Sequence, residues 1–94
     1  MLTLVVYDIH DDKRRQQLAK ILSRFGLTRV QYSAFKGDLN PNDKEVLIRK
    51  VTKYVVDEID CIFVIPLCGR CLATSEVISK NGRLLVSESS VKIV

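Results

Sequence analysis

The chain has no tryptophan and only three tyrosines and three phenylalanines, so we expect a mostly aliphatic core. It has no apolar run long enough to cross a membrane, and no basic region followed by a signal-type apolar segment at the N-terminus. Hydrophobic residues still make up 47%, which is ample for a globular protein. We therefore expect one cytoplasmic domain spanning residues 1–94, small enough for a second subunit to add much to its buried surface.

Histidine and cysteine are scarce, which excludes several kinds of site. His10 is the only histidine, and the three cysteines are Cys61, Cys68 and Cys71. An odd cysteine count without a signal segment argues against a disulfide framework. The Cys68–Cys71 pair is either two reduced thiols near a turn or half of a four-cysteine zinc site that a homodimer would complete. No Ser-His-Asp pattern, phosphate-binding glycine loop or dinucleotide fingerprint is present.

The net charge of +4 and the pI of about 9.1 are compatible with a nucleic-acid partner but do not require one. Arg14 and Arg15 lie on the first predicted helix, and Arg29 follows it. Arginine can hold a phosphate through two parallel hydrogen bonds. The alternative is that these charges form an ordinary solvated surface.

The stretch from 2 to 12, LTLVVYDIHDD, organises the rest of the chain. Its apolar start predicts a central strand over about 2–9, buried on both faces. Asp11 or Asp12 then caps a helix that Gly26 ends. Residues 27–39 alternate like strands, and the slip at 34–35 predicts a turn or bulge between two short antiparallel strands.

The second half of the chain begins with a predicted helix from about residue 40. Asn42 and Glu45 have the spacing of a capping box. A buried strand follows over 61–65, where Pro66 ends it or places it at an edge. We expect a loop over 67–72, a weaker strand over 73–78 and a turn at 81–82.

The predicted order is therefore βαββαβ, an α+β ferredoxin-like sandwich with both helices on one face. The apolar tail from about 83 to 94 lies outside this core. We expect it to add one or more C-terminal strands that pair with a second subunit.

Asp8 is the sharpest candidate for chemistry, because a charge at the exit of a buried strand is costly without a partner or a cation. Magnesium prefers carboxylate oxygens, generates hydroxide and offsets charge on a phosphate. One carboxylate makes a poor site, and two copies of Asp8 meeting across a two-fold axis make a better one. The alternative is that Asp8 caps a turn or pairs with an arginine. Ser33 and Phe35 line a groove or serve the bulge, and Tyr7 belongs to the core.

Two blocks of sequence carry a family resemblance. These are V-V-Y-D-I-x-D-D at 5–12, followed by Arg15, and R-V-Q-Y-S-A-F-K-G-D-L at 29–39. Together they resemble the small CRISPR-associated adaptation proteins that stand second in the Cas naming series. One departure is Gln17, where some relatives carry a basic residue. This weakens the case for a strong phosphate clamp on that face.

The resemblance implies a symmetric homodimer of ferredoxin-like subunits with an exchanged terminal strand. It also implies a metal-dependent endonuclease acting on single-stranded RNA or double-stranded DNA. The acid at Asp8 would be the magnesium ligand in each subunit, and Arg15 and Arg29 would position the strand. The nucleic-acid contacts expected on this basis are Arg14, Arg15, Arg29, Ser33 and Phe35.

The family also acts structurally, bridging the subunits of the CRISPR integrase during spacer acquisition. This leaves a non-enzymatic rival, in which the dimer is a DNA-binding scaffold and Asp8 is vestigial or structural. A third hypothesis is a toxin-like RNase on the same fold that acts without an integrase.

Overall fold

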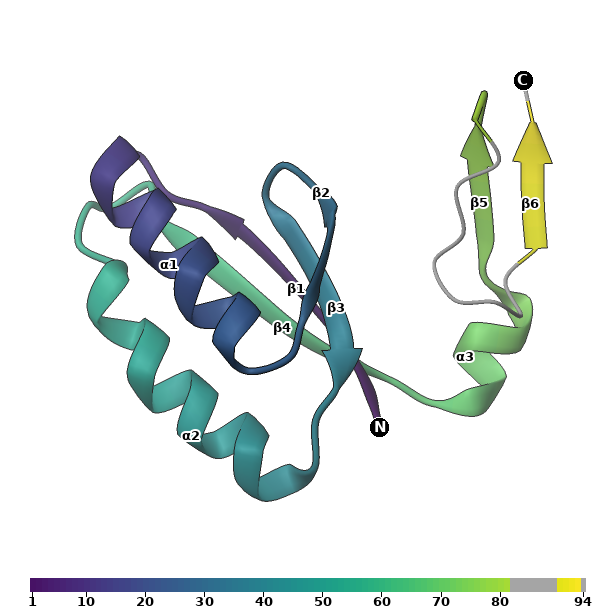
Figure 1. Cartoon of the computed structure of the whole chain (residues 1–94), viewed down its shortest axis with the longest axis horizontal. Coiled ribbons are helices and arrows are strands. Elements are labelled where there is room, and N and C mark those ends of the chain that lie inside the picture. The colour runs from purple at the N-terminus through teal and green to yellow at the C-terminus, as the bar shows by residue number, and fades with distance from the viewer. Residues whose placement is uncertain (82–89, 94) are drawn as a thin grey trace.

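Strand β1 (Leu2–Asp8) lies inside a four-stranded antiparallel sheet with the order β2-β3-β1-β4 (Figure 1). The computed structural model describes residues 1–81 and 90–93. Strand β4 (Cys61–Leu67) pairs with β1 along its whole length, and β3 (Ala34–Asp38) pairs with it from Leu2 to Val6. Because β4 is an edge strand, Pro66 is tolerated there, as predicted. The element order confirms the predicted ferredoxin-like βαββαβ core.

Local capping signals fix where the two long helices begin. In α1 (Asp12–Arg24), the Asp11 side chain accepts a hydrogen bond from the Arg14 backbone N–H at 2.9 Å. In α2 (Pro41–Val51), Asn40 accepts from the Asp43 N–H at 2.7 Å. The predicted Asn42–Glu45 capping box is therefore wrong, because a proline at the first helical position lets the helix begin two residues earlier.

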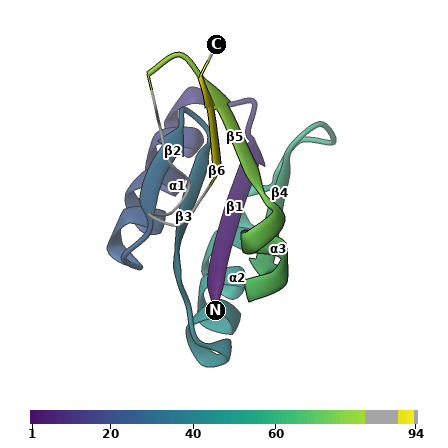
Figure 2. The same cartoon turned by 90° about the vertical axis from the view of Figure 1, so that its right-hand side faces the viewer.

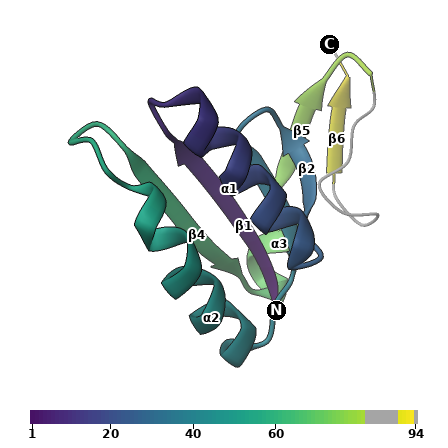
Figure 3. The same cartoon turned by 60° about the vertical axis from the view of Figure 1, so that its left-hand side comes forward.

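Both helices cover the same face of the sheet (Figures 1 and 3). Alternate β1 side chains, those of Thr3, Val5 and Tyr7, are buried on this face. The short helix η1 (Thr52–Tyr54) extends α2 and adds Tyr54 to the core. The rest of the buried cluster is mostly aliphatic, as expected: Ile9, Leu18, Leu22, Leu27, Phe35, Leu39, Leu47 and Val51.

Neither α1 nor α2 covers the opposite face of the sheet, and both lie behind the sheet in Figure 2. Strand β1 is therefore not buried on both faces as predicted. Leu4 and Val6 are half-buried there. Their register partners on β4, Ile65 and Phe63, are 40% and 56% exposed. Residues paired directly across an antiparallel ladder share a face. These four side chains therefore form an uncovered apolar surface, called the open face below.

The hairpin of β2 (Thr28–Gln31) and β3 turns at residues 32–33, two residues before the predicted position. Ala34 and Phe35 already belong to β3, and both are buried. The irregular register lies between Arg29 and Gln31 on β2. The extra β2 residue produces the slip in alternation that the sequence displays, and the turn follows it.

After β4, residues 69–74 form the helix α3 (Gly69–Thr74), so the predicted loop over 67–72 and strand start at 73 are wrong. Strand β5 (Glu76–Ser79) pairs in parallel with β6 (Ser90–Ile93) as a separate two-stranded sheet (Figure 1). The rest of the predicted 83–94 tail lies outside the described residues, and its pairing with a second subunit remains a prediction. Within the described ranges, no helix has the length and apolarity that a membrane span requires.

Candidate nucleic-acid and metal site

Asp8 is the last residue of β1 and its side chain is exposed. Side chains alternate along a strand, so Asp8 projects from the same face as Leu4 and Val6, the open face. No hydrogen bond or ion pair of its carboxylate appears among residues 1–81. The alternative that Asp8 caps a turn or pairs with an arginine therefore has no support in this part of the chain, and the carboxylate is available to a ligand.

Arg15 reaches from α1 back to the residue that follows Asp8. Its Nη1 donates to the Ile9 carbonyl oxygen at 3.1 Å, and its Nη2 forms an ion pair with Asp12. A hydrogen bond with Tyr32 and the bond to Asp12 raise the pKa of the Arg15 guanidinium, so it stays fully charged. Its Nε is buried with no partner among the described residues. These contacts hold a fixed cation at the end of β1.

Tyr32, at the tip of the β2–β3 hairpin, is close to two guanidinium groups. The Arg15 Cζ is 5.6 Å and the Arg29 Cζ 5.8 Å from the centroid of its ring. The ring is 69% exposed, so a planar ligand can reach it. Arginine over an aromatic face is a cation–π contact, and the same pair of groups can stack on an unpaired base.

Phe35 and Tyr7 are two buried aromatic residues packed at this hairpin. The Arg29 Cζ lies 5.0 Å from the Phe35 ring centroid, and the Phe35 ring packs against the Tyr7 ring at 6.3 Å. Both rings are only 2% exposed. Tyr7 is a core residue, as predicted. Phe35 positions Arg29 and is too buried to stack on a nucleic acid itself.

Ser33 joins the hairpin tip to the end of β1. Its carbonyl oxygen accepts from the Tyr7 backbone N–H at 3.0 Å, and the neighbouring Tyr32 carbonyl accepts from the Tyr7 hydroxyl at 3.4 Å. The predicted site is therefore assembled at one end of the sheet, but on two faces. Asp8 lies on the open face, whereas Arg29 and Phe35 lie on the helical face.

Arg14 forms ion pairs with two aspartates instead. Its Nη2 pairs with Asp57 at 2.9 Å and with Asp60 at 3.1 Å. Asp60 is buried and also accepts from the backbone N–H groups of His10, Val56 and Asp57. These bonds hold the pKa of the Asp60 carboxyl well below its usual range. The predicted contact of Arg14 with nucleic acid stays a prediction, since an ion-paired arginine has fewer free donors.

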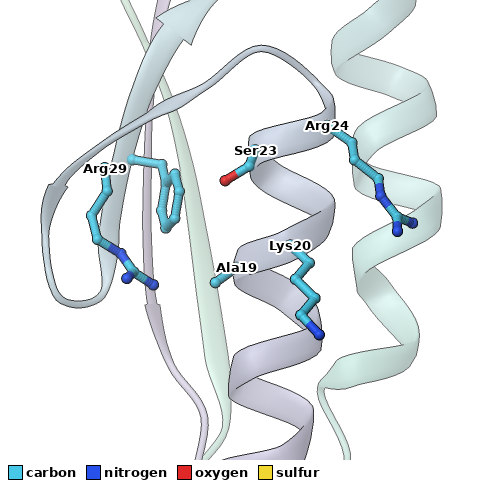
Figure 4. Close-up of a pocket in the computed structure, with 6 residues that line it drawn as sticks. Ala19, Lys20, Ser23, Arg24 and Arg29 are labelled. Carbon is cyan, nitrogen blue, oxygen red and sulfur yellow. The ribbon is translucent and has the colours of Figure 1, made fainter.

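Two basic grooves flank the outer surface of α1. One, of about 410 Å³, runs between α1 and β2, with Arg29 facing Ala19 and Ser23 across it (Figure 4). The other, of about 600 Å³, runs between α1 and η1 and includes Lys53. Lys20 and Arg24 line both grooves, and no carboxylate lines either. We call this surface the α1 ridge: Lys20, Arg24, Arg29 and Lys53.

The Asp8 carboxylate is the candidate ligand for a metal ion. Among residues 1–81 and 90–93, no group of three or more histidine, cysteine or acidic side chains converges on a point. Magnesium keeps several waters and often takes only one or two protein carboxylates. A free Asp8 carboxylate fits half of such a site, and a second copy of the chain would supply the other half.

Sequence reasoning did not identify Tyr32, Lys20 or Arg24 as site residues. Tyr32 had a detectable signal, because an aromatic residue at a hairpin tip is exposed. Lys20 and Arg24 lie on the outer surface of α1, and nothing in the local sequence marks them as groove residues. Only the packing of α1 between β2 and α2 creates those grooves.

A protein-family model matches most of this chain. Residues 1–75 match the family model of the CRISPR associated protein Cas2. A protein of Archaeoglobus fulgidus named CRISPR-associated endoribonuclease Cas2 1 is 63% identical over 94 residues, which is the full length of both chains. A protein of Desulforudis audaxviator named CRISPR-associated endoribonuclease Cas2 is 36% identical, covering 87% of this chain and 77% of its own.

Solved structures agree with these sequence matches. A hypothetical protein of Thermus thermophilus is 37% identical with a TM-score of 0.66, over 72% of this chain and 82% of its own. Cas2 of Streptococcus pyogenes is 27% identical with a TM-score of 0.64, over 72% of this chain and 87% of its own. The fold and these similarities agree: the chain belongs to the Cas2 family of CRISPR-associated proteins.

Proposed function

We propose that this chain is a homodimeric, magnesium-dependent endonuclease of CRISPR adaptation that hydrolyses phosphodiester bonds in single-stranded RNA or double-stranded DNA. The observation that carries the proposal is the exposed Asp8 carboxylate, which has no partner among residues 1–81, at the end of the strand where Arg15 binds the Ile9 carbonyl. The names of the relatives, which call them endoribonucleases, favour RNA as the first substrate to test.

The open face supports the homodimer. Phe63 and Ile65 expose a large apolar area to water, and burial of such area favours association. Asp8 projects from the same face, beyond Val6 on β1. A second copy docked there by two-fold symmetry would present its own Asp8 to the first, so one interface would both cover the apolar surface and complete the donor set.

The roles of the chain's own residues follow from their contacts. Asp8 of each subunit would hold Mg²⁺, which when bound supplies charge stabilisation to the phosphate and acidifies water. Arg15, held by Ile9 and Asp12, would bind a phosphate oxygen at the end of β1. Tyr32 would stack on a base, and Arg29 would bind the backbone on its helical side. The strand would therefore pass around the hairpin tip.

Cleavage of a labelled single-stranded RNA and of a DNA duplex tests this proposal. Asp8→Asn removes the charge with little change in shape, and Asp38→Asn makes the same change at the other end of the sheet, where the side chain is 86% exposed. We expect Asp8→Asn to abolish Mg²⁺-dependent cleavage and Asp38→Asn to keep it. Undiminished cleavage by purified Asp8→Asn would exclude the mechanism.

The α1 ridge favours a second candidate function, a non-catalytic scaffold that holds duplex DNA and the CRISPR integrase. Its cations line two grooves without an acid, which suits phosphate backbone binding without sequence preference. Here DNA binding would fall steeply with salt and would be unchanged in Asp8→Asn. Spacer acquisition that survives in cells carrying Asp8→Asn would favour the scaffold, and a pull-down that recovers no integrase would favour a toxin-like RNase instead.

A further inference from the structure

Cys68 and Cys71 stand together at the start of α3, away from the site described above. Cys68 is the N-cap of the helix, and its Sγ accepts a hydrogen bond from the Cys71 backbone N–H at 3.4 Å. The two Sγ atoms are 3.3 Å apart, and both residues are exposed. We propose that this pair is a thiol–disulfide exchange site, which reacts with low-molecular-weight disulfides and closes into an intramolecular disulfide.

The contacts distinguish the two sulfurs. Hydrogen bonds from the backbone N–H and the thiol of Cys71 lower the pKa of the Cys68 thiol. The same pairing raises the pKa of the Cys71 thiol. Since the thiolate is the attacking form, Cys68 is the nucleophile and Cys71 the resolving residue. This assignment agrees with the geometry, in which the Cys68 Sγ accepts a hydrogen bond from the Cys71 backbone N–H.

The exchange proceeds in two balanced steps. The Cys68 thiolate attacks one sulfur of a disulfide R–S–S–R, forms a mixed disulfide and displaces R–S⁻, which takes a proton from water. Cys71 then loses its proton and attacks the Cys68 sulfur, so that the second R–S⁻ leaves and is protonated. Two protein thiols are oxidised to one disulfide, and one small disulfide is reduced to two thiols.

Closing the pair requires only a small movement. A disulfide bond is about 2.05 Å long, so the sulfurs, now 3.3 Å apart, must approach by roughly 1.2 Å. The side chains are exposed, and no core packing opposes this rotation. Because α3 joins β4 of the main sheet to β5, the bond would fix the first turn of the segment that connects the two sheets.

A metal is the competing use of such a pair. Two thiolates supply half of a tetrahedral zinc site, and residues 1–81 and 90–93 hold no cluster of three or more candidate ligands. Zinc therefore requires a second chain, whereas the exchange reaction requires only one. The third thiol, Cys61, is half-buried in β4 and is replaced in the test so that only the pair can react.

The test uses the full chain carrying Cys61→Ser, treated with oxidised glutathione and analysed by intact mass. We expect a product lighter by two hydrogen atoms, with no accessible thiol left. In the same background, Cys71→Ser should stop at one glutathione on Cys68. Cys68→Ser should react roughly tenfold more slowly, because it lacks the thiolate.

Three results would overturn the proposal. One is a Cys71→Ser chain that stays unmodified while Cys68→Ser reacts readily. Another is a chain whose two thiols both retain glutathione without closing. The third is a reduced protein that binds one zinc ion per two chains and resists oxidation while the zinc is present. None of these depends on nuclease activity, so the outcome is independent of the proposed function.

Discussion

We expect Tyr32 to contact the nucleic acid, because its ring is exposed and close to two cations, whereas Phe35 is buried. We expect Tyr32→Ala to weaken binding of a single-stranded oligonucleotide by roughly 5- to 150-fold, the range for losing one stacked base. Fluorescence anisotropy with Asp8→Asn protein, which we expect to leave the strand uncut, measures this directly.

Tyr54→Ala is not a useful control for that experiment, because Tyr54 belongs to the core. Tyr32→Phe is the matched control, since it keeps the ring and removes only the hydroxyl. The stacking role requires Tyr32→Phe to bind within a few-fold of the parent. Equal binding by Tyr32→Ala and the parent would contradict that role.

The buried Asp60 carboxylate accepts hydrogen bonds from three loop N–H groups and from the Arg14 guanidinium. Its pKa is depressed in the folded protein, so the stability it supplies is present above its unfolded pKa of about 4 and is lost as pH falls below that value. We expect the melting temperature to drop steeply below about pH 5. Asp60→Asn should melt lower at pH 7 and show a flatter acid dependence.

Asp57→Asn is the matched control for this change, because Asp57 shares the ion pair with Arg14 but is half exposed. Exposed ion pairs contribute little to stability. Thermal melts of all three proteins from pH 3 to pH 7 separate the two acids. Identical acid profiles for Asp60→Asn and the parent would show that Asp60 carries no such linkage.

At the scale of elements, the α1–β2 connection depends on one backbone conformation. Gly26 has φ +85°, and a Cβ there would meet nothing within 4 Å, so a side chain would suffer only backbone strain. We expect Gly26→Ala to cost about 1–2 kcal/mol of unfolding free energy. Gly69→Ala is the control, since it has equal space without positive φ and lies in a helix, where alanine is favoured.

Urea denaturation of the two alanine variants should therefore give midpoints that move in opposite directions. A Gly26→Ala midpoint equal to that of the parent would mean that the helix end relaxes without strain.

Sequence patterns predicted the elements well where one period dominated. The start of α1 after Asp11 and the edge position of β4 required only local signals. The misplaced hairpin turn and the missed helix α3 had a common cause. In both places short elements follow each other within a few residues, and capping or a bulge decides the boundary more than hydrophobic period does.

Local sequence patterns also identify only part of the candidate site. Asp8 could be identified because a lone acid after an apolar run is unusual in any fold. The separation of Asp8 from Arg29 by the thickness of the sheet depends on strand register and could not be predicted from spacing alone. Nor could the engagement of Arg14, since its partners Asp57 and Asp60 lie more than forty residues away.

At the scale of the whole molecule, we expect the open face to determine whether two chains associate. Phe63→Glu places a charge in its centre, and the side chain is already 56% exposed, so the fold should survive. We expect sedimentation velocity to show a dimer for the parent and a monomer for Phe63→Glu. Ile59→Glu, at a loop residue that is 65% exposed, should leave the dimer intact. A dimer that persists in Phe63→Glu would place the interface elsewhere.

The central claim is that two copies of Asp8 share one divalent ion across that interface. Isothermal titration calorimetry with Mn²⁺ in place of Mg²⁺ measures the number of ions bound per chain and tests this claim most directly. We expect one ion to bind per two chains. Binding should be lost in Asp8→Asn and in monomeric Phe63→Glu but retained in Asp38→Asn. Binding of one ion to every chain, or binding that persists in Asp8→Asn, would contradict it.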